Sequence, residues 1–366
     1  MVTTGVELAV LVGAFVLGVA TVVYSVEVFI EAVAQSAVSL GISGFFLAVV
    51  LAGVDLENAV LGVTAAAVEL PGLALGTVFG EALFVLAVAV GIAGLLVPFR
   101  MDVPRIYLLL ILVVPLPAFA LSVDGTIGRA GGAGLLVLFV PLLTAIYWLE
   151  RRSETTYLLA EEVEGVVDLA EDRSGAEPTG QPDDVAEPAV EPDGDGTAAD
   201  EWLADVDLDV DEFVPSLEGR SGRFALGVAV LAAVGMTVGS GITVVSAEGI
   251  FVSLGISGLA FGATVLSFIA SIEELALTVE PVRQGRPHLA VGNVVGSTVF
   301  YVTANVGIVA LLTPIDTGGA VMTVHWPIFA ASLVVVAAML ARGRVTRSGG
   351  ALLLALYGVY WIANYA

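Results

Sequence analysis

Polar side chains recur at helical spacing inside two strongly apolar stretches in the second half of the chain. Within residues 255–281 they fall four, three and four residues apart, at Ser267, Ser271, Glu274 and Thr278. Within residues 289–313 every fourth residue is polar, at Asn293, Ser297, Tyr301 and Asn305. Such spacing places side chains on one face of a helix. Two helices are therefore expected to present carboxylate, amide and hydroxyl oxygens, the ligands that hard cations such as Ca²⁺ prefer.

The first half of the chain carries a comparable set of polar residues in two apolar stretches. Asp55 and Asn58 lie three residues apart and share a helix face, whereas Glu57 projects about 100° from Asn58. Thr77 and Glu81 lie four residues apart in the following stretch. Each half therefore supplies two helices with oxygen-bearing faces.

Carboxylates are unusually frequent in these apolar stretches. The five in question are Asp55, Glu57, Glu81, Glu273 and Glu274. Each costs about 2.5–3.5 kcal/mol at the centre of a bilayer on insertion scales. Bound cations offset this penalty naturally. Ser267, Thr278 and Asn305 fit either ion binding or hydrogen bonding between helices, and we interpret Tyr301 as a packing residue.

The composition predicts a membrane protein. Of the 366 residues, 58% are hydrophobic and only 14% are charged, and the mean hydropathy is +0.98. A bilayer core takes about 20 apolar residues per helix. Ten stretches meet this requirement: 5–30, 41–66, 72–97, 105–123, 130–149, 223–247, 255–281, 289–313, 324–341 and 348–364. The predicted fold is an all-α polytopic membrane protein with ten transmembrane helices.

The apolar pattern stops between Glu150 and Gly219. This segment contains 23 of the 37 acidic residues and is rich in Pro and Gly, which predicts a mostly disordered loop. Its stretch DVDLDVDEF, from Asp205 to Phe213, alternates carboxylates but lacks the glycine and glutamate spacing of an EF-hand. A solvated acidic loop is therefore preferred over a regulatory Ca²⁺ site.

The loop divides the chain into three expected segments. Residues 1–149 form a five-helix half with a repeat at about 41–97, residues 150–219 form the acidic loop, and residues 220–366 form a second five-helix half with a repeat at about 255–313. All 13 basic residues are Arg, and the acidic balance resembles that of proteins from extremely halophilic archaea. The chain has no Cys, which excludes disulfides and thiolate metal sites.

Arginine positions predict the orientation. With ten spans, 12 of the 13 Arg fall on one side and only Arg129 on the other, and the positive-inside rule makes the first side cytoplasmic. We expect a multi-pass protein of the cell membrane, with both termini outside and the acidic loop in the cytoplasm. His288 and His325 fall at predicted helix edges and are interpreted as loop residues.

The hexapeptide SLGISG occurs twice, at Ser39–Gly44 and at Ser253–Gly258. Each half has an odd number of predicted spans, so the second half must enter the membrane in the opposite orientation. Equivalent spans then run antiparallel, and the two copies become an inverted repeat. Secondary transporters are often built in this way, with the substrate site near the midplane.

The residues that follow the second SLGISG carry a family resemblance. The stretch GNVVGSTVF, the G-I-S entry and the spacing Ser271-x-x-Glu274 resemble the α-repeats of the cation/Ca²⁺ exchanger superfamily, in particular its sodium/calcium exchanger branch. In that family each repeat carries G-T-S-x-P-E and then G-N-x-x-G-S-N. The resemblance assigns ion-binding positions to Ser271, Glu274, Asn293 and Ser297.

The first repeat departs further from the family pattern. Aligned on Gly76, it has Asp55 at the Ser, Glu57 at the Pro and Asn58 at the Glu, with Glu81 at the second Ser. The family glutamate is therefore missing unless Glu57 replaces it. In the family, Gly and Pro break these helices, and the backbone carbonyls at the break complete the coordination of the cation. Both repeats of this chain lack the Pro, so carbonyl coordination is expected here only if the spans unwind without a Pro.

Together, these observations predict a secondary active antiporter that exchanges Na⁺ for Ca²⁺ by alternating access, rather than an enzyme. The expected cation ligands are Asp55, Glu57, Asn58, Glu81, Ser271, Glu273, Glu274, Asn293 and Ser297. Of these, Glu57 and Glu274 are expected to hold the metal ion. No cofactor is expected besides the transported ions Na⁺ and Ca²⁺, or H⁺.

Two alternatives stay open. Crowded carboxylates raise one another's pKa, which favours an exchanger coupled to H⁺. The eroded first repeat favours a cation sensor that has lost transport and uses the acidic loop as its output. The expected partners are inorganic cations and the lipid bilayer. Nucleic acid is excluded by the scarcity of basic residues, and a nucleotide by the lack of a phosphate-binding loop with its Lys.

Overall fold

The computed structural model describes residues 5–39, 56–101, 103–150 and 221–366. Within these ranges the regular structure is helical apart from four strands of two residues each. Six helices are long and apolar enough to cross a membrane: Gly5–Val33, Pro71–Leu96, Arg105–Ser122, Gly222–Leu254, Pro287–Leu312 and Val321–Ala341. A bent pair, Gly258–Ala270 with Glu274–Arg283, adds a seventh if it is one span. The fold is therefore that of an α-helical polytopic membrane protein, and the predicted acidic loop lies outside the described residues.

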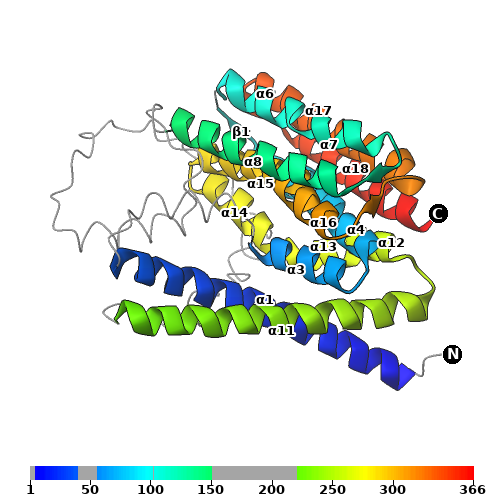
Figure 1. Cartoon of the computed structure of the whole chain (residues 1–366). Helices are drawn as coiled ribbons and strands as arrows, with labels where there is room; N and C mark the ends of the chain where they lie inside the picture. Colours follow the sequence, from blue (N-terminus) through cyan, green and yellow to red (C-terminus); the bar gives the residue numbers. More distant parts are fainter. Residues whose placement is uncertain (1–4, 40–55, 102, 151–220) are drawn as a thin grey trace.

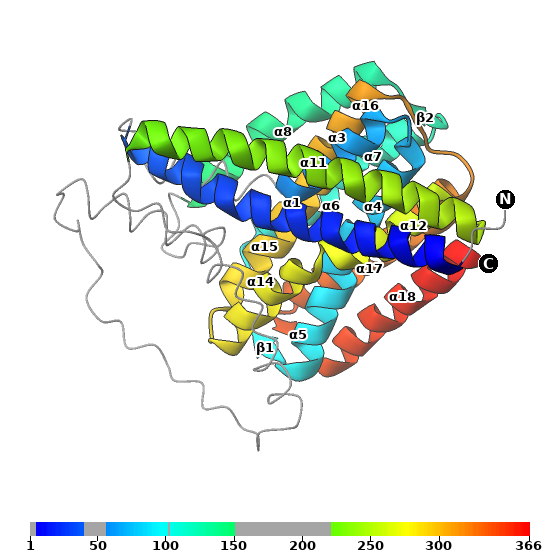
Figure 2. The ribbon, with the colours of Figure 1, turned by 90° about the horizontal axis from the view of Figure 1, so that it is seen from below.

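Two long helices lie side by side along one face of the bundle (Figures 1 and 2). They are α1 (Gly5–Ser39) and α11 (Gly222–Leu254). Leu11, early in α1, packs where a Cβ atom on Gly249 would lie, whereas Ser36, late in α1, donates a hydrogen bond to the Gly222 carbonyl at 3.3 Å. The two helices are therefore antiparallel.

The third predicted span of each half has the same internal structure. In the first half it consists of α4 (Pro71–Leu83), the π-helical turn η1 (Phe84–Ala89) and α5 (Val90–Leu96). In the second half it consists of α15 (Pro287–Phe300), η4 (Tyr301–Asn305) and α16 (Val306–Leu312). Both begin with Pro, and the preceding residues have nearly equal angles, φ −110° and ψ 55° at Leu70 and φ −109° and ψ 53° at Arg286.

Short strands and glycine contacts join the two halves in matching pairs. Strand β1 (Phe99–Arg100) pairs antiparallel with β4 (Arg344–Val345), and β2 (Thr126–Ile127) pairs antiparallel with β3 (Ile315–Asp316). Helix α5 packs on α18 (Arg347–Tyr365) where Gly91 meets Gly350, and α16 packs on α8 (Arg129–Glu150) where Gly307 meets Gly132. Small residues let the helix backbones approach closely.

Four consecutive elements replace a straight seventh span. They are α12 (Gly258–Phe261), η3 (Gly262–Leu266), α13 (Ser267–Ala270) and α14 (Ile272–Arg283). Helix α4 crosses them at glycines. A Cβ atom on Gly76 would lie 2.9 Å from the Ala263 nitrogen, and one on Gly80 would lie 2.6 Å from the Ala263 carbonyl oxygen.

The second SLGISG forms the turn between α11 and α12. Gly255 has φ 70°, the left-handed conformation that glycine adopts most readily, and ends α11. Ser257 then caps α12, because its Oγ accepts a hydrogen bond from the Ala260 nitrogen at 3.1 Å. Apart from its initial Ser39, the first copy lies outside the described residues.

The prediction that His325 is a loop residue is wrong. The helical structure begins at Val321 with η5 (Val321–His325), three residues before the predicted span, and continues into α17 (Trp326–Ala341). His325 is fully buried, and its Nδ1 lies 2.8 Å from the Tyr360 hydroxyl of α18. The connecting segment at Thr317 to Gly319 is short, so the histidine falls inside the bundle.

The remaining described helices are α3 (Leu56–Ala67), α6 (Arg105–Val113) and α7 (Pro115–Ser122).

Candidate functional site

The seventh predicted span is broken at Ser271. The helical segments Gly258–Ala270 and Glu274–Arg283 meet at 46°, and Ser271 itself has φ −100° and ψ 13°, outside the helical range. The break occurs without the family Pro, and the Gly of the family motif is Ile269 here. The Ser271 hydroxyl is fully buried, and none of the described residues hydrogen-bonds it. A buried oxygen therefore lies at the break, one turn before Glu274.

The Glu274 carboxylate is the centre of a buried hydrogen-bond network. It is 6% exposed. Asn293 donates from Nδ2 to Glu274 Oε2 at 2.6 Å, and Ser297 donates from Oγ to Glu274 Oε1 at 3.1 Å. Both partners lie on α15, one turn apart. Asn293 Nδ2 also lies 3.4 Å from the Thr278 hydroxyl, so the polar faces predicted for the two spans do meet.

Tyr301 joins this network to the first half of the chain. Its hydroxyl donates to Glu274 Oε1 at 3.2 Å and accepts a hydrogen bond from Asn58 Nδ2 of α3 at 3.3 Å. The side chain is fully buried. The prediction from the sequence that Tyr301 is a packing residue missed this contact. The signal that could have revealed it is its place four residues after Ser297, on the same face.

Asn58 and Glu274 occupy equivalent places in the two halves. Helix α3 covers Leu56–Ala67 and α14 covers Ile272–Arg283, so that both bounds differ by 216 residues. The same offset relates Pro71 to Pro287 and β1 to β3. This agrees with the sequence register that places Asn58 at the position of Glu274.

The other predicted ligands are buried on neighbouring elements or lie outside the described part of the chain. Glu57 on α3 is 5% exposed and Glu81 on α4 is fully buried. Asp55 lies outside the described residues. Glu273 lies in α14, but the structure describes only its backbone. Among the described residues, no three His, Asp or Glu side chains cluster as a metal site. The described network thus surrounds one carboxylate with hydroxyl and amide groups.

Comparison with known proteins identifies the family of this chain. Residues 10–148 and 224–366 match the family described as sodium/calcium exchanger protein, which is well over half of the chain. The chain belongs to the sodium/calcium exchanger family. The superfamily resemblance inferred from the α-repeat residues is therefore confirmed. The unmatched residues between these two ranges coincide with the acidic segment, so the exchanger family shares the two helical halves.

Individual relatives support the exchanger assignment. The chain is 27% identical over 303 residues to the inner membrane protein YrbG of Escherichia coli, covering 82% of this chain and 79% of YrbG. It is 25% identical over 359 residues to the protein named "Putative antiporter CaxA" of Alkalimonas amylolytica, covering 94% of this chain and 96% of that protein.

Two solved structures share the exchanger fold. The H⁺/Ca²⁺ exchanger CAX superposes with a TM-score of 0.66 at 14% identity, covering 97% of this chain and 84% of CAX. The sodium-calcium exchanger NCX_Mj, soaked with Na⁺ and Sr²⁺, superposes with a TM-score of 0.50 at 20% identity, covering 98% and 99% of the two chains. At these identities the likeness concerns the fold.

Proposed function

We propose that this chain is a secondary active antiporter that exchanges Na⁺ for Ca²⁺ by alternating access at a site centred on Glu274. The observation that carries the proposal is the buried Glu274 carboxylate, which accepts hydrogen bonds from Asn293 and Ser297. The Tyr301 hydroxyl links this carboxylate to Asn58. The family, the relative named as an antiporter and the two solved exchangers of similar fold support the same activity.

The proposed cation ligands come from both halves of the chain. Glu274 and Glu57 supply the charge for the metal ion, and the remaining ligands are Asp55, Asn58, Glu81, Ser271, Glu273, Asn293 and Ser297. The buried Ser271 hydroxyl at the helix break supports this assignment, because an oxygen that none of the described residues hydrogen-bonds suits a hard cation.

The same proposal includes ten membrane spans in two inverted halves. Helices α1 and α11 open the two halves and run antiparallel, as inversion requires. The third span of each half packs on the last helix of the other half, α5 on α18 and α16 on α8. Each of the two strand pairs likewise joins one strand from each half. Such exchanged contacts are expected of a pseudo-two-fold axis in the membrane plane.

The geometry suggests how exchange is coupled. Glu274 carries the charge, while Asn293 and Ser297 hold its two oxygens from α15. A cation that enters must compete with Asn293 and Ser297 for the oxygens of the Glu274 carboxylate. Only an ion whose charge and ligand number fit the site can replace these hydrogen bonds by coordinating the carboxylate. If only occupied states reorient, one cation leaves only when another takes its place.

Exchange coupled to H⁺ is the second candidate. Glu57, Glu81 and Glu274 are all at most 6% exposed, and a carboxylate removed from water is stabilised by a proton as well as by a cation. These three residues could therefore carry H⁺ across the membrane in place of Na⁺.

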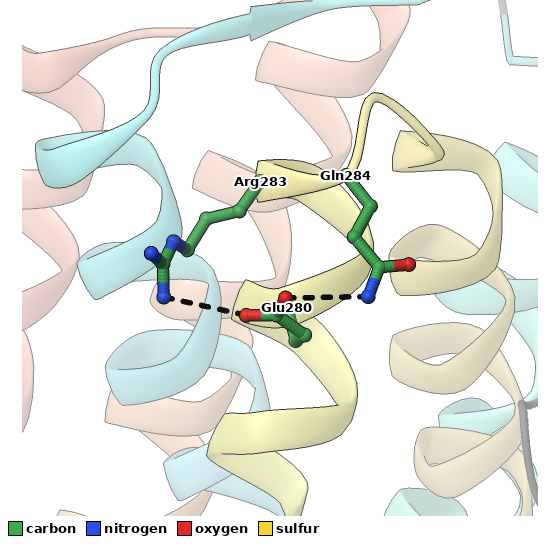
Figure 3. Close-up of polar contacts among 3 residues, drawn as sticks. All are labelled: Glu280, Arg283 and Gln284. Atoms are coloured by element: carbon green, nitrogen blue, oxygen red, sulfur yellow. Dashed lines mark hydrogen bonds and ion pairs between the residues drawn. The ribbon is translucent and has the colours of Figure 1, made fainter. Parts of the chain in front are cut away.

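Ca²⁺ efflux from proteoliposomes tests both candidates. Vesicles are loaded with Ca²⁺, and outward Ca²⁺ movement is followed with a Na⁺ gradient or an H⁺ gradient imposed separately. The test variant is Glu274→Gln, which keeps the side-chain shape and removes the charge. The matched control is Glu280→Gln in the same helix, where the carboxylate forms an exposed ion pair with Arg283 at 3.4 Å and accepts a hydrogen bond from Gln284 at 3.2 Å (Figure 3).

We expect one gradient to drive Ca²⁺ movement, Glu274→Gln to abolish it, and Glu280→Gln to retain it, since exposed ion pairs contribute little. The gradient that works identifies the coupling ion. If neither gradient moves Ca²⁺ or any other tested cation, the antiporter proposal fails and a sensor role gains support.

A further inference from the structure

Tyr301 has no counterpart in the first half of the chain. At the 216-residue offset that relates α3 to α14 and α4 to α15, its equivalent is Val85, which is fully buried but has no hydroxyl. The Tyr301 hydroxyl therefore belongs to one half only, yet it contacts Asn58 and Glu274, the two equivalent positions of both halves. One hydroxyl thus bridges the two equivalent positions.

The two hydrogen bonds of this hydroxyl fix the orientation of both partners. Because Tyr301 gives its proton to Glu274 Oε1, only a donor can approach the hydroxyl oxygen from Asn58, and Asn58 duly presents Nδ2. The Asn58 amide thus turns its NH₂ group, rather than its Oδ1, toward the hydroxyl. An amide nitrogen does not ligate a hard cation, whereas an amide oxygen does.

A cation and the hydroxyl compete for the same groups. Both need Glu274 Oε1, and a cation between the repeats also needs Asn58 Oδ1, which requires the amide to turn over. We propose that Tyr301 is a latch: its hydroxyl bridges Asn58 and Glu274 when no cation is bound, and a bound cation displaces it. If the chain is the proposed antiporter, the latch keeps the cation-free carrier from reorienting, and this consequence rests on the proposed function.

The proposal predicts the sign of a binding change. Tyr301→Phe removes the hydroxyl but keeps the ring, so the cation no longer has to break two hydrogen bonds. Ca²⁺ should then bind about tenfold more tightly, equivalent to about 1.4 kcal/mol. If the hydroxyl were itself a Ca²⁺ ligand, the same variant would bind more weakly.

The experiment is isothermal titration of the purified full chain in detergent with Ca²⁺ at alkaline pH. The variants are Tyr301→Phe and, as matched control, Tyr357→Phe in α18, which removes the same atom from a buried tyrosine packed on Phe84. We expect tighter binding for Tyr301→Phe and unchanged binding for Tyr357→Phe. Weaker or unchanged affinity in Tyr301→Phe would overturn the latch.

A second measurement does not depend on the folding of the variant. Adding Ca²⁺ to the wild-type chain should produce a tyrosine ultraviolet difference spectrum, because Tyr301 leaves its carboxylate partner. Absence of that signal on Ca²⁺ binding contradicts the latch. A binding shift without flux in vesicles refutes the antiporter but not the latch, whereas flux without the shift refutes the latch alone. A wild-type chain that binds no cation overturns both.

Discussion

At the scale of single residues, the Glu274 carboxylate depends on donors from another helix. Its hydrogen bond from Asn293 is the shortest of the three described, at 2.6 Å. Hydrogen bonds to charged groups contribute about 1.5–3 kcal/mol each to stability. Asn293 is therefore the position where the charge of the site can be altered with the least change in shape.

Replacing Asn293 by Asp tests whether the network binds cations. Asn293→Asp sets a second carboxylate beside Glu274 Oε2, so repulsion should lower the melting temperature in chelator. A divalent cation neutralises both charges, and Ca²⁺ should raise the melting temperature at least twice as much as in the wild type. The measurement is thermal unfolding in detergent with and without Ca²⁺. The control Asn364→Asp, where Asn364 donates to the Tyr360 carbonyl, should show the wild-type response. An equal Ca²⁺ effect in both variants would count against ion binding at Asn293.

Residue spacing predicted part of this network. Glu274, Asn293 and Ser297 follow a helical period in apolar surroundings, and the structure brings them into contact. Tyr301 follows the same period, but an aromatic ring fits packing as well as hydrogen bonding, so the pattern did not decide between them. His325 was misplaced because helix ends are poorly determined by hydropathy, and a shift of three residues moved it from a loop into the core.

At the scale of elements, a close helix crossing lies next to the site. Gly80 precedes Glu81 on α4 and lies against Ser267 and Ala263 of the bent span. The sequence predicted the two spans but not their contact, because a glycine in an apolar helix indicates only that something comes close. The helix break at Ser271 was also unpredictable from local sequence, since neither Gly nor Pro marks it.

Gly80→Ala should separate α4 from the bent span. The added Cβ atom would lie 2.6 Å from the Ala263 carbonyl oxygen and closer still to Ser267, and overpacking of this kind costs about 1–3 kcal/mol. Gly134→Ala is the control, because Gly134 of α8 has no atoms within 4 Å of an added Cβ among the described residues. There alanine should be neutral or stabilising by up to about 1 kcal/mol. Unfolding in mixed micelles measures both. Equal stability of the two variants would show that the crossing is not tightly packed.

At the scale of the whole molecule, the two halves share one spacing of elements. The two copies of SLGISG are 214 residues apart and the helices that follow are offset by 216 residues, which is the pattern expected of two copies of one unit. The antiparallel packing of α1 on α11 could be predicted only after the spans were counted, because hydropathy does not encode direction. What the sequence could not supply is the pairing of strands and glycines between the halves. Those contacts join residues at least 175 positions apart.

The absence of Cys from the chain permits a direct test of orientation, since any introduced Cys is the only labelling site. In Figure 1 the beginning of α1 and the end of α18 lie on the same side of the bundle, and the arginine distribution predicts that this side faces the outside. A membrane-impermeant maleimide should therefore label Val6→Cys and Tyr365→Cys in intact cells, because both positions are exposed. Ser348→Cys, at the other end of α18, should react only after permeabilisation, and the Cys-free parent should not react. Labelling of Val6→Cys and Tyr365→Cys from opposite sides would rule out an even number of spans. Labelling of Ser348→Cys in intact cells would instead reverse the orientation and place the acidic loop outside.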